Sequence, residues 1–354
     1  MTAAKPKKLD AFKSLPLVKK IGFNRVILIG VIFALYGLFA LLSPILHNGT
    51  SFVNYARIMS ALNYCYFIGF LGLGVTFVIA TGGIDISQGS VIAISGAVCC
   101  SLIGGAADGT AQMPLLPACL IAVAVCAACG VWNGFLVSKL NIQPMVATLI
   151  LMTAGRGIAM LITKGQNVTV YYKPFTYIGN TIPGSPLPTT IYIAAAMVAL
   201  VVFIQKKTSV GLFVQSVGIN AEASRRTGLK VTGIIFMMYI FSGVCAGIAG
   251  LMESSMIAAA DPNNAGLNME MDAILAVALG GTLLSGGKFY ISGSIIGAIT
   301  IQTLTTTLYA LGVSSEQLPV CKAVVVILIC LIQSEKFKKM VERRSLKKKA
   351  VEQA

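Results

Sequence analysis

Apolar stretches long enough to cross a lipid bilayer recur along this chain of 354 residues. A helix needs about 20 apolar residues to span the hydrocarbon core. Only 11% of the residues are charged and the mean hydropathy is +0.84, whereas soluble domains carry roughly 25% charged residues. We therefore expect an all-α polytopic membrane protein with ten spans, several of them short or Gly-rich, near residues 26–46, 55–80, 88–106, 114–137, 142–163, 189–205, 232–257, 270–285, 290–311 and 318–334.

Basic residues gather at the two ends of the chain, with seven Lys and Arg in 5–25 and eight in 336–349. Such juxtamembrane clusters favour the cytoplasmic face. With both ends inside, twenty-two Lys and Arg fall in cytoplasmic segments and two in external loops. This asymmetry predicts cytoplasmic segments at 1–25 and 335–354 and a transmembrane domain at 26–334 with a cytoplasmic loop at 206–231. The external segment 164–188, rich in Tyr, Pro and Gly, is expected to form an ordered cap.

The segment 211–231 is the only long polar stretch between the charged ends. Asn220 can cap a helix N-terminus because its side chain accepts an otherwise unpaired N–H, and Gly228 can take the left-handed position after the helix. The charges between them complement the helix dipole: Glu222, Arg225 and Arg226. The pattern predicts one short exposed helix at 221–227, which fits either a docking handle for a soluble partner or an interfacial linker without one.

Several polar residues fall at membrane depth, where a charge costs on the order of 2.5–3.5 kcal/mol and usually faces a cavity or a partner. Arg156, between two glycines, is the deepest cation. The alternative is that these residues form internal ion pairs or caps, and a cap of the following helix by Asp85 or Ser87 would explain Asp85 alone. The candidates for a substrate pathway are Asn63, Asp85, Asn133, Arg156, Glu253, Asp272 and Gln302.

No catalytic residue, metal site or cofactor is expected. The stretch 280–288, GGTLLSGGK, has Thr282 where a phosphate loop needs Gly and is followed by Phe289 where it needs Ser or Thr. The one histidine is isolated, which excludes a Ser/His/Asp set, and Cys126 and Cys129 form a CxxC without a second pair. The net charge of +15 is explained by the juxtamembrane clusters, so a nucleic-acid partner is not expected.

Two stretches share the pattern of two glycines, five residues, then Gly-Ser, an aliphatic residue and Ile. They read GGIDISQGSVI at 82–92 and GGKFYISGSII at 286–296. Transporters are often built from internal repeats, but eleven residues can also match by chance in a chain with 36 glycines. Both interpretations stay open.

The stretch TGGIDISQGSVIAISGA at 81–97 resembles the signature of the ribose-type sugar permeases of bacterial ABC importers. The stretches at 132–157 and 271–289 are similar to the same family, and VGINAEASRRTGLKV at 217–231 is similar to its coupling segment, which docks on the ATPase. The resemblance covers about 25–333. Segments 143–166 and 261–267 look most like the branch that carries furanose-form sugars, which include galactofuranose and fructose, with ribose and xylose in some members. Gln88 and Lys288 depart from residues common in the family.

The resemblance implies a permease subunit of an ATP-driven monosaccharide importer in the bacterial cytoplasmic membrane, not itself an enzyme. The implied partners are an ATP-binding cassette subunit, an extracytoplasmic sugar-binding protein, a second permease chain, identical or different, and membrane lipid. The residues that match the coupling segment are Gly218, Asn220, Ala221, Glu222, Ala223, Arg225, Arg226 and Gly228. The alternative is an ion-coupled secondary transporter of a small polar solute, in which Glu253 and Asp272 would titrate and no capped docking helix would be needed.

Overall fold

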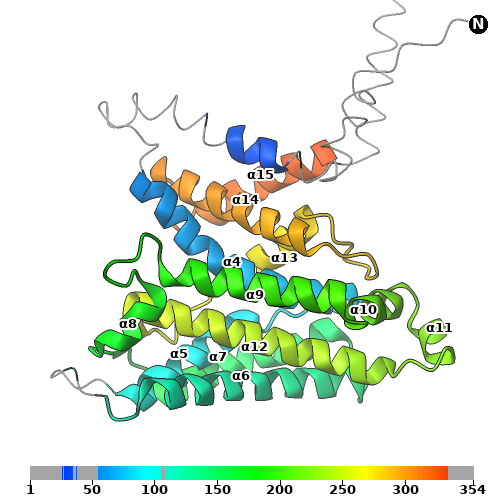
Figure 1. The fold of residues 1–354 in the computed structure, drawn as a ribbon, viewed down its shortest axis with the longest axis horizontal. Coiled ribbons are helices and arrows are strands. Elements are labelled where there is room, and N and C mark those ends of the chain that lie inside the picture. Colours follow the sequence, from blue (N-terminus) through cyan, green and yellow to red (C-terminus); the bar gives the residue numbers. More distant parts are fainter. Residues whose placement is uncertain are drawn as a thin grey trace, which may run out of the picture. The chain divides into compact units, whose positions relative to one another are not determined.

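The computed structural model describes residues 26, 28–34, 37, 55–104, 109 and 111–333. The chain divides into two compact units, one formed by residues 55–299 and the other by residues 1–54 together with 300–354. Apart from one two-stranded antiparallel sheet, the regular elements of the described residues are helices (Figure 1). The expected all-α class is therefore confirmed.

The unit formed by residues 55–299 contains most of the described elements. The helices are α4 (Tyr55–Ala80), α5 (Gln88–Ile103), α6 (Leu115–Ser138), α7 (Pro144–Thr163), α8 (Lys173–Gly179), α9 (Thr189–Lys207), α10 (Val210–Ile219), α11 (Ala221–Arg226), α12 (Val231–Ile257), α13 (Met269–Leu279) and the first half of α14 (Ile291–Ala310). The two strands are β1 (Val168–Thr169) and β2 (Ala259–Ala260).

Among the described residues, a helix lies at each predicted span from 55–80 onward. Five helices are long and apolar enough to cross a membrane: α6, α7, α9, α12 and α14. The first predicted span, 26–46, lies largely outside the described residues, as do the segments 1–25 and 335–354. The fold thus supports a polytopic membrane protein, while ten full-length spans remain a prediction.

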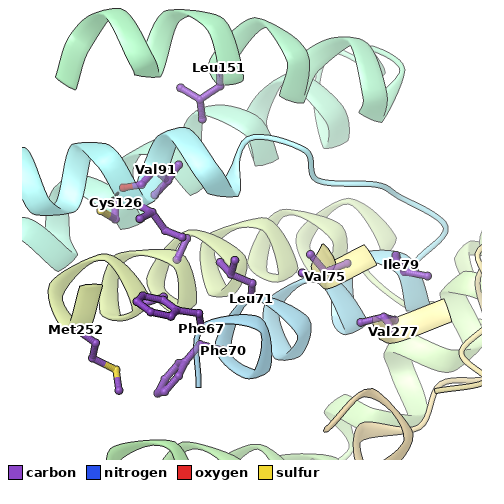
Figure 2. Close-up of a cluster of buried hydrophobic side chains, with 14 residues drawn as sticks. Phe67, Phe70, Leu71, Val75, Ile79, Val91, Cys126, Leu151, Met252 and Val277 are labelled. Atoms are coloured by element: carbon purple, nitrogen blue, oxygen red, sulfur yellow. Dashed lines mark hydrogen bonds between the residues drawn. The ribbon is translucent and has the colours of Figure 1, made fainter. Parts of the chain in front are cut away.

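In the unit formed by residues 55–299, two helices at predicted spans are shorter than the hydrocarbon core, and we call α5 and α13 the half-helices. At about 1.5 Å per residue, the 16 residues of α5 and the 11 residues of α13 give roughly 24 Å and 17 Å, against a hydrocarbon core of about 30 Å. The helix predicted to reach residue 285 ends at Leu279, where Gly280 and Gly281 begin a turn. Non-helical backbone leads into both half-helices, and Figure 2 shows the segment 81–87 running from the end of α4 back to α5.

The beginnings of the two half-helices meet inside the unit. A side chain on Gly89, in the first turn of α5, would collide with the carbonyl of Gly266, which lies just before α13. The converse substitution at Gly266, which has a φ of +66°, would place its Cβ 2.5 Å from the Gly89 carbonyl. This crossing therefore requires glycine on both sides, and it brings irregular backbone from two distant segments together in the interior.

The core of this unit lies between α4, α5, α12 and α13 (Figure 2). Phe70, Leu71 and Ile79 of α4 pack near Val277 of α13, and all four are almost fully buried. Helices α6 and α12 approach closely through small residues, since a Cβ on Gly243 would lie 2.5 Å from the Cys126 carbonyl. Small residues allow such approaches where no hydrophobic effect drives helices together in lipid.

The segment 164–188 is ordered, as predicted. Strand β1 pairs with β2, with Val168 opposite Ala260. Ser255, near the end of α12, donates to the Phe175 carbonyl at 2.6 Å and accepts the Gly179 N–H at 2.7 Å. These bonds tie α8 to the end of α12, and we call this side of the unit the α8 end and the opposite side, which carries α10 and α11, the α11 end (Figure 1).

In the other unit, the described residues include the second half of α14 and helix α15 (Leu318–Gln333). Leu304 and Leu308 of α14 pack with Leu318 of α15. Gly312 takes a φ of +81° in the turn that joins the two helices.

Candidate functional site

The non-helical segment between α4 and α5 carries a buried carboxylate, Asp85, of which only 3% is exposed. One oxygen, Oδ1, accepts hydrogen bonds from the backbone N–H and the hydroxyl of Ser87, at 3.0 Å and 2.7 Å. The other, Oδ2, accepts from the hydroxyl of Ser242 on α12 at 2.5 Å. Ser87, at the N-cap of α5, makes no side-chain capping bond. Asp85 does accept a backbone N–H at the start of α5, but its bond with Ser242 of α12 shows that a cap alone does not explain this residue.

Two amide side chains complete this arrangement. Asn133 of α6 donates to the Ser87 hydroxyl at 2.8 Å, and Gln88 of α5 donates to the Ser242 hydroxyl at 2.7 Å. Since each serine gives its single hydroxyl hydrogen to Asp85, it can only accept from the amides. The bonds therefore run in one direction, from amide to hydroxyl to carboxylate, and join three helices. We call Asp85, Ser87, Gln88, Asn133, Tyr239 and Ser242 the central polar cluster.

The direction of these bonds leaves oxygen atoms without hydrogen-bond donors. Gln88 Oε1, Asn133 Oδ1 and the Tyr239 hydroxyl have no partner, although each residue is at most 1% exposed. The Tyr239 oxygen faces Gly83, where a Cβ would lie 2.6 Å away. A buried polar atom without a partner costs about 1–3 kcal/mol. Such atoms point to a water or ligand that supplies donors.

A second polar centre surrounds the segment 261–267, which leads into α13. Arg156 of α7 donates from Nη1 to the carbonyls of Ala265 and Pro262, at 2.6 Å and 3.2 Å. Glu253 of α12 accepts the Gly266 N–H through Oε1 at 3.3 Å, while its Oε2 has no partner. The two predicted pathway residues Arg156 and Glu253 are thus brought together, and both hold the same backbone segment.

The start of α13 adds a carboxylate that the sequence analysis did not select, Glu270. It is 2% exposed, its Oε1 has no partner, and its Oε2 lies against Gly89 at the start of α5. Asp272 lies in the first turn of the same helix, as predicted, and is half-buried. Glu270 therefore connects the second centre to the half-helix that follows the central polar cluster.

The two remaining pathway candidates are Gln302 and Asn63. Gln302 belongs to the other unit, where it donates to the Thr306 hydroxyl at 3.4 Å. Asn63 lies in α4, and its side chain is outside the described residues. Among the described residues, five of the seven buried side chains with an unpartnered polar atom belong to the two centres. This concentration makes them the candidate site.

The predicted docking helix is present as α11, Ala221–Arg226, one residue shorter than expected. Asn220 is its N-cap and accepts the Ala223 N–H at 2.9 Å. Glu222 pairs with Arg225 at 3.7 Å and with Arg226 at 3.4 Å. Gly228 follows with a φ of +89°, as the sequence predicts for the residue that ends the helix.

The segment before α11 was expected to be a loop and is instead a helix, α10. Its buried residues are Gly211, Val214 and Val217. Val214 packs in the cluster that includes Val201 of α9 and Tyr239 of α12. Residues 211–219 are less polar than the rest of the segment, and this difference could have indicated a packed helix. Helix α10 therefore places Gly218 and α11 on a packed support.

Long apolar helices, two half-helices that meet inside the unit, and buried polar centres at that meeting point define a polytopic membrane permease. Residues 57–333 match the family described as "Branched-chain amino acid transport system / permease component", and the chain belongs to that family. It is a membrane permease component, and in this family the permease is not itself an enzyme.

The chain is similar to curated permeases over most of its length. It is 44% identical over 278 residues to the galactofuranose transporter permease protein YtfT of Escherichia coli (strain K12), which covers 78% of this chain and 79% of that protein. It is 42% identical over 289 residues to the fructose import permease protein FruF of Bifidobacterium longum (strain NCC 2705), with 79% of each covered. It is 36% identical over 272 residues to the ribose import permease protein RbsC of Escherichia coli (strain K12), covering 75% and 82%. No solved structure matches.

Proposed function

We propose that this chain is the permease subunit of an ATP-driven importer of a monosaccharide that presents a furanose ring. The observation that carries the proposal is the similarity to permeases named for galactofuranose, fructose and ribose, at 44%, 42% and 36% identity over about three quarters of the chain. Fructose, galactofuranose, ribose and xylose are the sugars to test first.

The sugar passes through the region where the two half-helices begin. A neutral sugar carries hydroxyl hydrogens, and the buried atoms without partners at the two centres include four acceptors: Gln88 Oε1, Asn133 Oδ1, Glu253 Oε2 and Glu270 Oε1. Carboxylate and amide oxygens accept hydroxyl hydrogens without needing a charged substrate. The match between missing donors and a donor-rich solute supports this route.

Helix α11 docks on an ATP-binding cassette subunit at the cytoplasmic face. The observation that supports this docking is that α11 is capped, exposed and charged while the helices around it are apolar. On this proposal the α8 end faces outside, where an extracytoplasmic sugar-binding protein would meet the segment 164–188. A second permease chain and lipid would cover exposed apolar side chains of α6 and α7, which include Leu120, Trp132, Ile150 and Leu161.

Uptake of labelled fructose tests the function, in cells that carry the complete importer with or without this chain. Ribose, xylose, galactose and leucine serve as competitors, leucine because the family description names amino acids. We expect uptake that requires this chain, is reduced by a sugar but not by leucine, and survives collapse of the proton gradient while ATP is maintained. Uptake that stops with the gradient would instead support an ion-coupled secondary transporter.

The sugar route has a matched pair of variants on α6. Asn133→Ala removes an unpartnered acceptor of the central polar cluster, whereas Ser138→Ala removes an unpartnered buried hydroxyl on the same helix outside it. We expect Asn133→Ala to raise the sugar concentration needed for half-maximal uptake and Ser138→Ala to leave it unchanged. Equal effects of the two variants would contradict the route.

A further inference from the structure

The end of α10 is wedged between two glycine-rich turns at the α11 end of the unit. We call Gly218 with Gly82, Gly286 and Gly287 the glycine joint. A Cβ on Gly218 would collide with the Ala80 carbonyl and with the Gly287 N–H. That N–H donates to the same Ala80 carbonyl at 2.9 Å. Three chain segments, far apart in sequence, are thus in backbone-to-backbone contact.

The two turns of the joint both need residues without a side chain. Gly82, Gly286 and Gly287 have φ values of +85°, +91° and +90°, where a Cβ is strongly disfavoured. A Cβ on Gly286 would also lie 2.9 Å from the Gly218 carbonyl and 3.0 Å from the Gly82 nitrogen. The three segments are therefore packed without free space, and a shift of one segment must displace the other two.

Each segment of the joint leads to a different part of the permease. Gly218 is followed by Ile219 and by Asn220, the N-cap of α11. The turn at Gly82 continues through Asp85 into α5 and so into the central polar cluster. The turn at Gly286 follows α13, whose other end carries Glu270. One contact thus connects the exposed helix to both half-helices.

We propose that the glycine joint transmits the movement of α11 to α5 and α13, with Gly218 and Ile219 as the positioning residues. This inference rests on the proposed function, because it requires that an ATPase moves α11. Displacement of α10 would move the Ala80 carbonyl and the Gly287 N–H together, and with them the segments that precede α5 and follow α13. The acceptors that face the sugar would then shift in step with ATP binding.

Gly218→Ala tests the joint against Gly233→Ala as its control. Gly233 lies in the first turn of α12, where the nearest atom to an added Cβ is 3.9 Å away. In the complete importer, reconstituted in lipid vesicles, we expect Gly218→Ala to co-purify with the ATPase and hydrolyse ATP. We expect it to move at least about fivefold less sugar per ATP, the lower end of typical coupling between sites. Gly233→Ala should retain the wild-type ratio.

A second pair keeps the test decisive if Gly218→Ala does not fold, because it removes atoms rather than adding them. Ile219 and Leu212 both lie on α10 and are 66% and 65% exposed. A Cβ on Gly287 would lie 2.9 Å from the Ile219 side chain, whereas Leu212 is not among the contacts of the joint. We expect Ile219→Ala to lower the sugar moved per ATP and Leu212→Ala to leave it unchanged.

Different results would overturn the proposed function and the role of the glycine joint. If the wild-type complex shows no ATP-dependent sugar uptake, the proposed function is wrong. If the wild type transports and the Ile219→Ala complex, or a folded Gly218→Ala complex, keeps the wild-type ratio of sugar to ATP, the glycine joint does not transmit the movement. A loss of ATPase co-purification in Ile219→Ala would also overturn the inference, since it would make this residue part of the docking surface.

Discussion

Two carboxylates of this chain each gather several partners, one in the interior and one on the surface. Asp85 accepts three hydrogen bonds at 2.5–3.0 Å and is 3% exposed. Glu222 pairs with two arginines at 3.7 Å and 3.4 Å, and its side chain is 61% exposed. Asp85 joins residues of the 81–87 segment and α12, whereas Glu222 pairs within one helix.

The two carboxylates differ in their access to water. Water can replace the arginines of Glu222, so that exposed pairs contribute about 0.2–1 kcal/mol or less. Asp85 is only 3% exposed, so bulk water cannot replace its donors. Each buried donor left without an acceptor costs about 1–3 kcal/mol. Loss of Asp85 should therefore destabilise the whole unit, whereas loss of a pair on α11 should change only what the surface can bind.

Asp85→Ala is expected to have the largest effect. It removes the acceptor of three donors, the Ser87 N–H, the Ser87 hydroxyl and the Ser242 hydroxyl. We expect a loss of at least about 3 kcal/mol in the free energy of unfolding, by the cost of unpaired buried groups. The measurement is thermal unfolding in detergent, monitored with a thiol-reactive dye. The dye reports unfolding because Cys99, Cys126 and Cys245 are buried and free, and they react only when the unit opens.

Glu222→Ala is the control for this prediction, since it also removes a carboxylate with several partners. Its unfolding should stay within about 0.5 kcal/mol of the wild type, as for exposed pairs. Equal unfolding temperatures for the two variants would mean that the interior of the unit is wet and that the central polar cluster is not a closed network.

Ser242→Ala is expected to have an intermediate effect. It leaves one oxygen of Asp85 without its α12 donor and the Gln88 amide without its acceptor, at about 1–3 kcal/mol. Ser254→Ala on the same helix is the matched control, because Ser254 is also buried but bonds to the Gly250 carbonyl of its own helix. A Ser254→Ala variant that unfolds as readily as Ser242→Ala would show that the loss is not specific to the link with Asp85.

The sequence was sufficient for the parts of the fold that depend on local chemistry. Asn220, Glu222 and Gly228 predicted α11 to within one residue, because caps and charges act within a single turn. The long apolar runs predicted the helices of the unit, because the length and hydropathy of a run are read from neighbouring residues alone. The two stretches that share a pattern also share local structure: Gly82 and Gly286 both have positive φ, and each is followed by a helix.

The parts that the sequence did not predict depend on contacts between distant segments. The apolar runs at 88–106 and 270–285 do not reveal that their helices end early, at Ile103 and Leu279. Glu270 lies two residues before the chosen Asp272, and only the approach of Gly89 shows which of the two is buried. Ser242 and Tyr239 have no polar neighbours in sequence, so nothing local linked them to Asp85.

Asn220→Ala is expected to have a smaller, local effect. The variant loses the bond that the side chain accepts from the Ala223 N–H at 2.9 Å, and an N-cap contributes about 1 kcal/mol to its helix. We expect faster amide hydrogen exchange in residues 221–226 with no change in the thiol-probed unfolding of the unit. Asn220→Ser, which retains a capping oxygen, should restore slow exchange. Loss of protection in α12 as well would show that the cap stabilises more than α11.

Arg225→Glu is expected to have the smallest effect on stability and a large effect on assembly. It replaces an exposed pair with two like charges one turn apart, which costs roughly 0.2–0.5 kcal/mol on a helix surface. We therefore expect membrane insertion and unfolding close to those of the wild type but little co-purification with the ATPase. Lys230→Glu reverses another exposed basic residue just past α11 and should retain the partner. If Arg225→Glu binds the ATPase and transports normally, α11 is an interfacial linker, and the contrast with Asp85 concerns stability alone.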